Sequence, residues 1–388
     1  MMIRPLTLAS AASFSPTRIE ALARAADVDA VRYSRTRNFL NGDVTRLSPY
    51  ITHGLISIPE LLTSIHARRA LSWDDKLAFE FGWREYFHHA WHRLGDDIWR
   101  EQNAPPASHY AATMPDDIRT ASTGVAIIDQ QVRALYTTGY LHNHARMWIA
   151  SYVVHIRKVS WQAGAKWMYS HLLDGDLASN TLSWQWVAGT WTGKPYLFNA
   201  ENVERYAPGV DCTGSVIDAT YETLDAIARS NKVAVSAKPL FVDPIVEPTC
   251  LSEPSLRRAE TSIDAALEPV WLMHPWSLHL PDERAAVGII NTDFHALYPW
   301  SLSRWQFVMT AMQARCSDIL VGTTAALSQQ LAEKNLSAIN TLNPFYNDLL
   351  QRVVRNALPA PRAFANPGML KRSVTSFWNQ ARREPFPA

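Results

Sequence analysis

Four short polar segments carry the residue types that chemistry requires. The first is Thr45-Arg46-Leu47-Ser48, followed by Pro49. Hydroxyls and backbone N–H groups at a helix start can hold a phosphate, because the first amides of a helix lack intrahelical partners. The same pattern is typical of a plain helix start, with Ser48 as the N-cap and Pro49 at the first helical position. The residues alone leave both interpretations open.

The second segment contains Glu80, Trp83 and Arg84. Glu80 and Arg84 stand four residues apart, so on a helix they share a face and can form an ion pair. An amphipathic helix with a surface ion pair explains this pattern as well as a binding site does. His88 and His89 end the same segment, but adjacent residues point in different directions on a helix, and we expect no metal site.

Two further segments combine turn signals with polar side chains. The third runs from Thr138-Gly139 through Asn143 and His144 to Arg146-Met147. The fourth runs from Asp174-Gly175-Asp176 through Asn180 to Trp184-Gln185-Trp186. Asp176 and Asn180 are one helical turn apart and would face the same way. Asp-Gly-Asp could begin a calcium loop, but the remaining ligand spacing is missing.

Composition narrows the class of protein. The 388 residues carry a net charge of +1, with 47% hydrophobic and 19% charged residues, which is typical of a globular protein of two or three domains. Three cysteines exclude a disulfide framework, and no apolar run approaches the roughly 20 residues of a membrane span. We expect a soluble, cytoplasmic monomer. Fifteen tryptophans exceed the needs of a core and suggest stacking or electron transfer.

The elements that must position these segments change along the chain. Apolar spacing near 3.6 predicts a helical domain over residues 1–210, with helices at 56–65, 76–92, 125–136, 146–156 and 163–173. Residues 211–267 are proline-rich in part and predict a linker or an extended wrap. Short apolar runs at 270–273, 287–290 and 319–322 then predict strands, with helices at 303–315, 324–333 and 347–356 before a proline-rich tail. The predicted fold class is therefore mainly α, with a small α/β, Rossmann-like domain over 268–388.

Taken in order, the four segments resemble the FAD-binding domain of the photolyase/cryptochrome family over about residues 30–205. The chain is most similar to cyclobutane pyrimidine dimer photolyases. The resemblance implies a helical bundle that holds FAD in a bent form. Relatives normally begin with an α/β domain that carries an antenna chromophore. Here the helical domain starts almost at Met1, so we expect that this antenna domain is lacking, and whether the chain holds an antenna chromophore stays open.

The resemblance also implies the cofactor contacts. Residues around the diphosphate and ribitol would be Tyr33 and Thr45, Arg46, Leu47 and Ser48. Arg146 and Asp174 would pair beside the isoalloxazine, and a fixed cation there can stabilise an anionic ring. Asp176, after Gly175, would contact the polar edge of the ring. Asn180 would face flavin N5, where it cannot donate a carboxyl proton, as in repair enzymes.

The lesion contacts follow from the same resemblance. Glu80 would hydrogen-bond a thymine dimer, and Trp83 and Trp186 would stack against it once it is flipped out of the duplex. The remaining substrate residues would be Arg37, Arg84, Asn143, His144 and Met147. Photolyases for (6-4) photoproducts need histidines at the positions of Asn143 and Met147, so a cyclobutane dimer is the expected substrate. Dimer-specific relatives usually carry arginine at the position of His144.

The resemblance gives the tryptophans a role. Trp184 and Trp161 match the first two members of a relay that carries electrons to photoexcited oxidised flavin. The third member could be Tyr110, Trp99 or Trp148. Packing of the core is the alternative role for Trp161 and Trp184.

The predicted function is light-driven repair of cyclobutane pyrimidine dimers in UV-damaged DNA, with FAD as cofactor, no metal and no membrane partner. A cryptochrome-like FAD photosensor without repair activity is the main alternative. A flavoprotein that has lost its light chemistry and only binds single-stranded DNA is a third.

Overall fold

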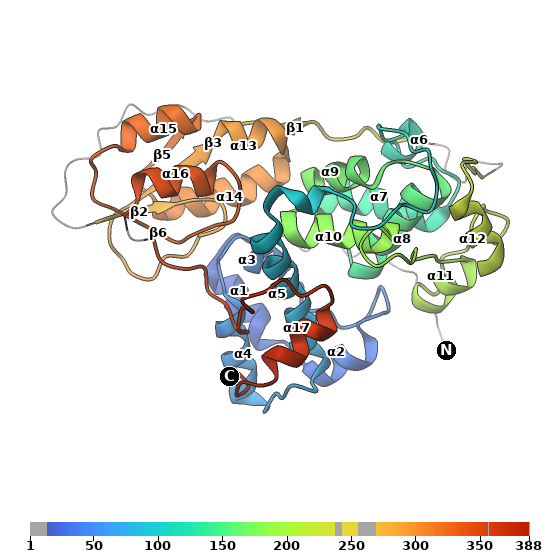
Figure 1. The fold of residues 1–388 in the computed structure, drawn as a ribbon, viewed down its shortest axis with the longest axis horizontal. Coiled ribbons are helices and arrows are strands. Elements are labelled where there is room, and N and C mark those ends of the chain that lie inside the picture. Colours follow the sequence, from blue (N-terminus) through green and yellow to red (C-terminus); the bar gives the residue numbers. More distant parts are fainter. Residues whose placement is uncertain (1–13, 237–242, 255–268, 356, 388) are drawn as a thin grey trace. The chain divides into compact units, whose positions relative to one another are not determined.

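The computed structural model describes residues 14–236, 243–254, 269–355 and 357–387 (Figure 1). These residues fall into two compact units, each made of separate stretches of the chain. The helical unit contains Asp29–Val44 and Leu94–Pro248. The mixed unit contains Phe14–Val28, Thr45–Arg93 and Thr249–Ala388.

The described part of the helical unit consists of helices joined by loops of varied length. They are α2 (Ala30–Thr36), a 3-10 turn (Gly95–Trp99), α6 (Asp116–Arg119), α7 (Ala126–Thr138), α8 (Asn143–Ser151), a π-helical turn (Tyr152–Ile156), α9 (Trp161–His171), α10 (Leu177–Ala188), α11 (Ala200–Tyr206) and α12 (Tyr221–Arg229).

Local sequence signals fix where the central helices begin and end. Ser160 caps α9 by accepting a hydrogen bond from the Ala163 amide, and Asp176 caps α10 by accepting one from the Ser179 amide. Helix α10 ends at Gly189, whose φ of +80° is a left-handed conformation that favours glycine. The chain therefore turns sharply on both sides of α10.

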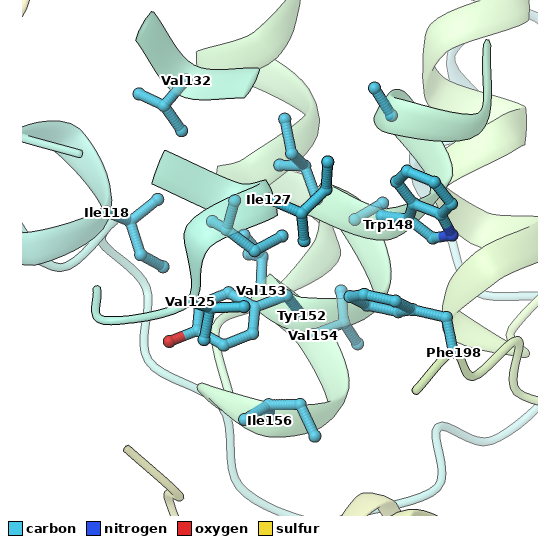
Figure 2. Close-up of a cluster of buried hydrophobic side chains, with 14 of the residues drawn as sticks. Ile118, Val125, Ile127, Val132, Trp148, Tyr152, Val153, Val154, Ile156 and Phe198 are labelled. Atoms are coloured by element: carbon cyan, nitrogen blue, oxygen red, sulfur yellow. The ribbon is translucent and has the colours of Figure 1, made fainter. Parts of the chain in front are cut away.

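Apolar side chains from several helices form the core of the helical unit. Figure 2 shows part of this core, where the Trp148 and Phe198 rings are nearly parallel, with centroids 5.9 Å apart. Burial of such side chains supplies most of the stabilisation, at about 25 cal/mol per Å² of apolar surface. The other labelled members, all buried, are Ile118, Val125, Ile127, Val132, Tyr152, Val153, Val154 and Ile156.

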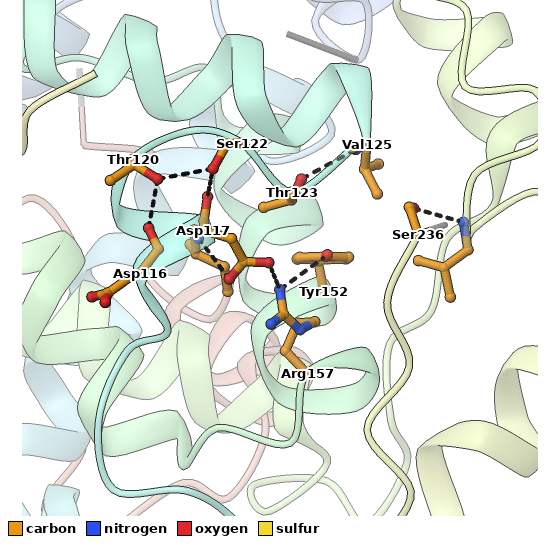
Figure 3. A network of polar contacts seen from close by, with 12 residues as sticks. Asp116, Asp117, Thr120, Ser122, Thr123, Val125, Tyr152, Arg157 and Ser236 are labelled. Carbon is orange, nitrogen blue, oxygen red and sulfur yellow. Dashed lines mark hydrogen bonds and ion pairs between the residues drawn. The ribbon is translucent and has the colours of Figure 1, made fainter. Parts of the chain in front are cut away.

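A network of polar side chains fixes the loop between α6 and α7 (Figure 3). The buried Arg157 guanidinium donates to Asp117 at 2.5 Å and lies 3.4 Å from the Tyr152 hydroxyl. Because an unpaired buried cation is costly, this pairing stabilises the loop. The Thr123 hydroxyl accepts from the Val125 amide at 3.1 Å, directly before α7.

The mixed unit combines a helical part with a parallel sheet. Its helices are α1 (Arg18–Ala26), α3 (Ser48–Thr52), α4 (Ile58–Arg68), α5 (Lys76–Leu94), α13 (Thr292–Leu297), α14 (Leu302–Arg315), α15 (Thr324–Leu331), α16 (Tyr346–Val353) and α17 (Val374–Ala381). Strands β2 (Val270–Met273), β3 (Ala286–Asn291), β5 (Asp318–Gly322) and β6 (Leu336–Ala338) form one sheet in the order β5-β3-β2-β6. Strands β1 (Cys250–Leu251) and β4 (Trp300–Ser301) pair antiparallel.

Every described pairing in the four-stranded sheet is parallel. The two central strands, β2 and β3, are buried along their whole length. This is the pattern of a parallel sheet covered on both faces, and it explains why these strands are continuous apolar runs.

The end of the chain packs along α5 within the mixed unit, where α17 lies beside that helix (Figure 1). Gly82 leaves room for the Trp378 ring, because a Cβ atom at Gly82 would lie 2.5 Å from it. The Trp378 ring also meets Phe79 with centroids 5.3 Å apart. Buried Glu85 accepts hydrogen bonds from the amides of Ala363 and Phe364 at 2.6 and 3.0 Å.

The structure confirms the predicted fold class, with a mainly helical chain and a small parallel sheet. The three predicted strands are present, and the predicted helices are present with shifted ends. The prediction for 146–156 was partly wrong, because the α-helix gives way to a π-helical turn at Tyr152. The end of the helix predicted at 347–356 includes Asn356, which lies outside the described residues.

Two segments predicted to lack regular structure contain helices. Helix α12 lies within the predicted linker 211–267, of which 237–242 and 255–268 are outside the described residues, and α17 lies within the predicted tail. The domain boundaries at 210 and 268 stay predictions. Within the described ranges, no helix is long and apolar enough to cross a membrane.

Replacing Gly82 by alanine tests the packing of α17 on α5. The new methyl group would overlap the buried Trp378 ring, and overpacking costs about 1–3 kcal/mol, which over most of this range exceeds the gain of about 1 kcal/mol in helix propensity. We expect a lower free energy of unfolding in urea. Gly368→Ala is the control, since nothing lies within 4 Å of its added Cβ. Equal stability of Gly82→Ala and the unmodified chain would contradict this packing.

Candidate cofactor and substrate site

An ion pair in the helical unit joins α8 to the turn before α10. Arg146 donates from Nη2 to Asp174 Oδ2 at 2.7 Å, and from Nε to the Leu141 carbonyl at 3.0 Å. The Asp174 side chain is only 2% exposed, whereas that of Arg146 is 24% exposed. A carboxylate this deeply buried needs its cation, because removing either partner leaves an uncompensated charge. The pair predicted from the sequence is therefore present.

Asp176, the N-cap of α10, and Asn180, within its first turn, are close to this ion pair in sequence. Asp176 is buried, and its Oδ1 accepts the Ser179 amide at 2.8 Å. Asn180 donates its side-chain amide to the Ala165 carbonyl of α9 at 2.8 Å, which fixes the side chain between two helices. One turn of α10 thus holds a carboxylate and a carboxamide in set positions.

Two hydroxyls on the same helix lack partners. Ser179 Oγ and Thr181 Oγ1 are buried and have no hydrogen-bond partner among the residues that the structure describes. Buried polar groups in folded proteins are almost always hydrogen-bonded. These orphan hydroxyls, beside Asp176 and Asn180, fit a helix that meets a polar ligand.

Tryptophans line the packing between α9 and α10. The buried Trp184 ring rests on Gly164 of α9, where a Cβ atom would lie 2.3 Å from the ring. Trp161, one turn before Gly164, is buried and donates its Nε1 to Glu101 at 3.3 Å. Its ring stacks on Trp99 with centroids 5.9 Å apart and planes 8° apart. Trp184 and Trp161 therefore both lie on or against α9, and Trp161 stacks on Trp99.

The same geometry bears on the three candidates for a third relay member. Trp99 is half-buried and stacks directly on Trp161. Trp148 is fully buried, pairs with Phe198 and donates to Asn202 at 3.1 Å. Tyr110 accepts the Ala107 amide through its hydroxyl. Of these three side chains, Trp99 is the one that stacks on Trp161 among the described residues.

The start of α8 gathers the third segment. Asn143 is exposed and lies 3.6 Å from the sulfur of Met147, one turn along the helix. His144 stacks on Tyr206 of α11 with centroids 5.1 Å apart. Burial, with a contribution from the nearby Arg37 cation, lowers the pKa of His144 to about 4. At neutral pH this imidazole is therefore uncharged.

The structure places the other predicted residues of the helical unit on its helices. Tyr33 and Arg37 are half-buried and joined by one helical hydrogen bond, from the Arg37 amide to the Tyr33 carbonyl at 2.9 Å. Gly175 lies in the turn between Asp174 and Asp176. Trp186 of α10 is half-buried and lies against Tyr196, with ring centroids 5.7 Å apart.

In the mixed unit, the Thr45–Ser48 segment forms a strained turn into α3. Arg46 adopts a φ of +51°, a left-handed conformation that is uncommon for a residue other than glycine. The Thr45 hydroxyl accepts the Leu47 amide at 3.4 Å. The interpretation of Ser48 as a helix cap was wrong. Leu47 is the N-cap and makes no side-chain cap bond, since the left-handed turn at Arg46 starts the helix one residue earlier and makes Ser48 its first residue.

Glu80, Trp83 and Arg84 lie on α5 of the mixed unit and are all half-buried. Glu80 forms an ion pair with Lys76 at 3.7 Å, an i,i+4 pair that the sequence analysis did not single out. Trp83 contacts the rings of Phe79, Tyr86 and Phe87. Aromatic neighbours thus hold Trp83 beside a carboxylate on the same helix.

Sequence reasoning missed Tyr206, Glu101, Ser179 and Thr181. Tyr206 and Glu101 come from elements distant in sequence from the side chains they contact, so no local spacing announces them. Ser179 and Thr181 lie inside the Asp174–Trp186 segment, where their flanking of Asn180 was the available signal.

Comparison with known proteins assigns a family to part of the chain. Residues 77–235 match the sequence family described as FAD binding domain of DNA photolyase. The chain is 32% identical over 164 residues to the deoxyribodipyrimidine photo-lyase of Streptomyces griseus, covering 41% of this chain and 35% of that one. It is 31% identical over 188 residues to a cryptochrome DASH of Ostreococcus tauri, covering 45% and 34%. A crystal structure of the Synechocystis sp. PCC6803 cryptochrome has 24% identity and a TM-score of 0.46, covering 54% of this chain and 46% of that one.

Residues 77–235 are therefore similar to the FAD binding domain of DNA photolyase, and the chain is similar to both photolyases and cryptochromes. The chain spans about a third of the length of the two curated relatives above. Photolyases and cryptochromes both occur among its relatives at about 30% identity.

The low pKa of His144 predicts a pH dependence of stability. The folded chain holds this imidazole neutral down to about pH 4, whereas in the unfolded chain it is protonated below about pH 6.5. The unfolded state thus binds more protons between these values, and stability falls as the pH drops through this window. Between pH 7 and pH 4.5, we expect the free energy of unfolding of His144→Gln to fall by about 1–2 kcal/mol less than that of the unmodified chain.

Urea unfolding at several pH values measures this difference. His109→Gln, which removes an exposed imidazole of the same unit, is the control. Parallel pH profiles for His144→Gln and the unmodified chain would show that His144 is not held neutral.

Proposed function

We propose that this protein is a light-driven DNA repair enzyme that splits cyclobutane pyrimidine dimers with FAD as cofactor. The observation that carries the proposal is the buried Arg146–Asp174 ion pair, next in sequence to Asp176 and Asn180, within a segment that matches a photolyase FAD-binding domain. The photolyases among its relatives support the choice of reaction.

The residues present fit FAD. Ser179 and Thr181 have buried hydroxyls whose hydrogen bonds are not made within the described residues, which suits a polar ligand at α10. Arg146 would supply a fixed cation, and Asp176 and Asn180 would supply polar contacts. Tyr33 and the Thr45–Ser48 segment are the proposed residues for the phosphates and ribitol. When bound, FAD would supply a light-activated source of one electron.

The chain's own residues would bind, orient and shield the substrate. Glu80 is the proposed hydrogen-bonding partner of the dimer, and it would stabilise charge that develops on the thymine carbonyls. Trp83 and Trp186 offer aromatic faces on which unstacked bases can lie, and such contacts are worth about 1–3 kcal/mol per base. Arg37, Arg84, Asn143, His144 and Met147 are the remaining proposed substrate contacts. A dimer is already poorly stacked, so flipping it costs less than flipping normal bases.

A cryptochrome-like photosensor is the second candidate function. The neutral His144, where relatives usually carry arginine, removes a cation that would hold a DNA phosphate. A match to a cryptochrome DASH at 31% identity supports the same alternative. A series of tryptophans from α10 to the half-buried Trp99 is compatible with either function.

Glu80→Gln tests the repair proposal. The protein is loaded with FAD, reduced without oxygen, mixed with a thymine-dimer oligonucleotide and illuminated, while thymine absorbance is followed. The unmodified chain should restore the absorbance. Glu80→Gln should lower the repair yield per absorbed photon several-fold, because the amide replaces the proposed carboxyl contact, while FAD content stays unchanged.

Glu20→Gln removes a carboxylate from α1 of the same unit and should repair normally. If the unmodified, reduced and FAD-loaded chain restores no thymine, the photosensor becomes the better account. A normal yield from Glu80→Gln would instead remove only the role assigned to Glu80.

Trp99→Phe tests the relay. Because Trp99 stacks on Trp161 and reaches the surface, its loss should slow light-driven reduction of bound oxidised flavin at least several-fold. Bleaching of the flavin bands under blue light, with an external reductant present, measures this rate. Tyr110→Phe should leave the rate unchanged, and repair by chemically reduced Trp99→Phe should be normal. Slowing by Tyr110→Phe alone would assign the third position to Tyr110.

A further inference from the structure

The last part of the chain is strongly basic and anchored. Residues 357–387 contain five arginine or lysine side chains and one carboxylate, Glu384. Two of these cations form ion pairs in the mixed unit, Arg362 with Glu85 and Arg382 with Asp74. For Lys371, Arg372 and Arg383 no ion pair occurs among the described residues. Lys371, Arg372 and Arg383 are therefore the cations of this segment that could bind an anionic partner.

The backbone of this segment is held firmly by α5. The Lys371 amide donates to His89 Nε2 at 3.0 Å, and His89 Nδ1 lies 2.7 Å from the Asn366 side-chain oxygen. These contacts require a neutral imidazole with its proton on Nδ1, and burial lowers the pKa of His89 accordingly. Lys371 therefore starts from a fixed position.

One face of helix α17 is buried, and the opposite face is exposed to solvent. Val374, Phe377, Trp378 and Ala381 recur at i, i+3, i+4 and i+7 and are buried. The opposite face borders an open cavity of about 420 Å³. Its lining comprises Lys371, Ser373, Thr375, Ser376, Asn379, Gln380 and Arg383.

The chemistry of this lining selects an anion. It contains two cations, three hydroxyls and two carboxamides, and no carboxylate. Surface helices ordinarily carry charges of both signs, whereas every group here can donate a hydrogen bond. Hydroxyls, carboxamides, lysine and arginine are the groups with which proteins hold phosphate oxygens of nucleic acids.

The extent of the cavity favours a polyanion over a single small anion. Its lining runs along the whole of α17, about 12 Å at 1.5 Å per residue. A DNA strand carries one phosphate about every 3.4 Å of helix axis and can meet cations before and after the helix. We infer that this surface, called the α17 groove, binds the phosphodiester backbone of DNA without regard to sequence. The inference rests on the proposed function, which makes DNA the substrate.

The variant Lys371→Gln/Arg383→Gln tests the groove through the salt dependence of binding. Fluorescence anisotropy would measure the affinity of the FAD-loaded chain for two duplexes, one undamaged and one with a thymine dimer, between 50 and 200 mM NaCl. Each lost phosphate contact lowers the magnitude of the negative slope of log K against log salt by about 0.9. We expect a slope lower by about 1.8 and an affinity at least about tenfold weaker at 0.1 M salt, equally for both duplexes.

Two controls separate the groove from general charge effects. Arg229→Gln/Lys232→Gln removes the same charge from the helical unit and should change the slope much less. Lys371→Arg/Arg383→Lys keeps both cations and should keep the slope. FAD content and the thermal midpoint of each variant report whether it is folded.

The outcomes also separate the groove from the proposed function. An unchanged slope in folded Lys371→Gln/Arg383→Gln overturns the groove, even if dimers are repaired. A lowered slope in a chain that neither prefers nor repairs dimers supports the groove and contradicts the repair function. If the variant loses binding to vesicles of anionic lipid but not to DNA, the groove serves a membrane surface and the inference is wrong.

Discussion

The Arg146–Asp174 ion pair is the interaction on which the candidate site depends. The Asp174 carboxylate is almost completely buried, and a charge in that place costs several kcal/mol unless it is paired. Arg146 supplies the pairing from α8 and is held in turn by the Leu141 carbonyl. Two apolar side chains in place of Arg146 and Asp174 would fill the same space at a lower cost in free energy. We propose that the ion pair serves a ligand that requires a cation and a carboxylate at fixed positions.

Close packing of α9 on α10 turns this local arrangement into a larger one. Gly164 lets the Trp184 ring lie directly on α9, and the Asn180 amide ties α10 to the Ala165 carbonyl. The same helix begins at Trp161, whose ring stacks on Trp99. Contacts between α9 and α10 therefore fix the positions of both the polar groups on α10 and the tryptophans. In the mixed unit, a corresponding constraint at Gly82 seats α17 on the helix that carries Glu80 and Trp83.

Much of the fold could be predicted from local patterns, because apolar spacing reports directly which face a helix or strand buries. The strand at 270–273 and the helix at 76–92 are examples. Helix α17 was not predicted from the sequence, because nearby prolines suggested a tail. The helix that buries its apolar face is also far away in the sequence. For the site, the resemblance supplied Arg146 with Asp174, and the structure contains that pair. Sequence could not rank Trp99, Tyr110 and Trp148, since stacking on Trp161 depends on tertiary packing. The neutral state of His144 likewise depends on burial and on Arg37, which no spacing near His144 reveals.

The central claim is that the helices around the Arg146–Asp174 pair hold FAD. The most direct measurement is the visible absorption spectrum of the purified chain, with the flavin quantified after its release by denaturation. The account predicts flavin bands and a stoichiometry near one FAD per chain. A folded chain that shows no flavin absorption, even after incubation with excess FAD and removal of the unbound cofactor, would contradict it.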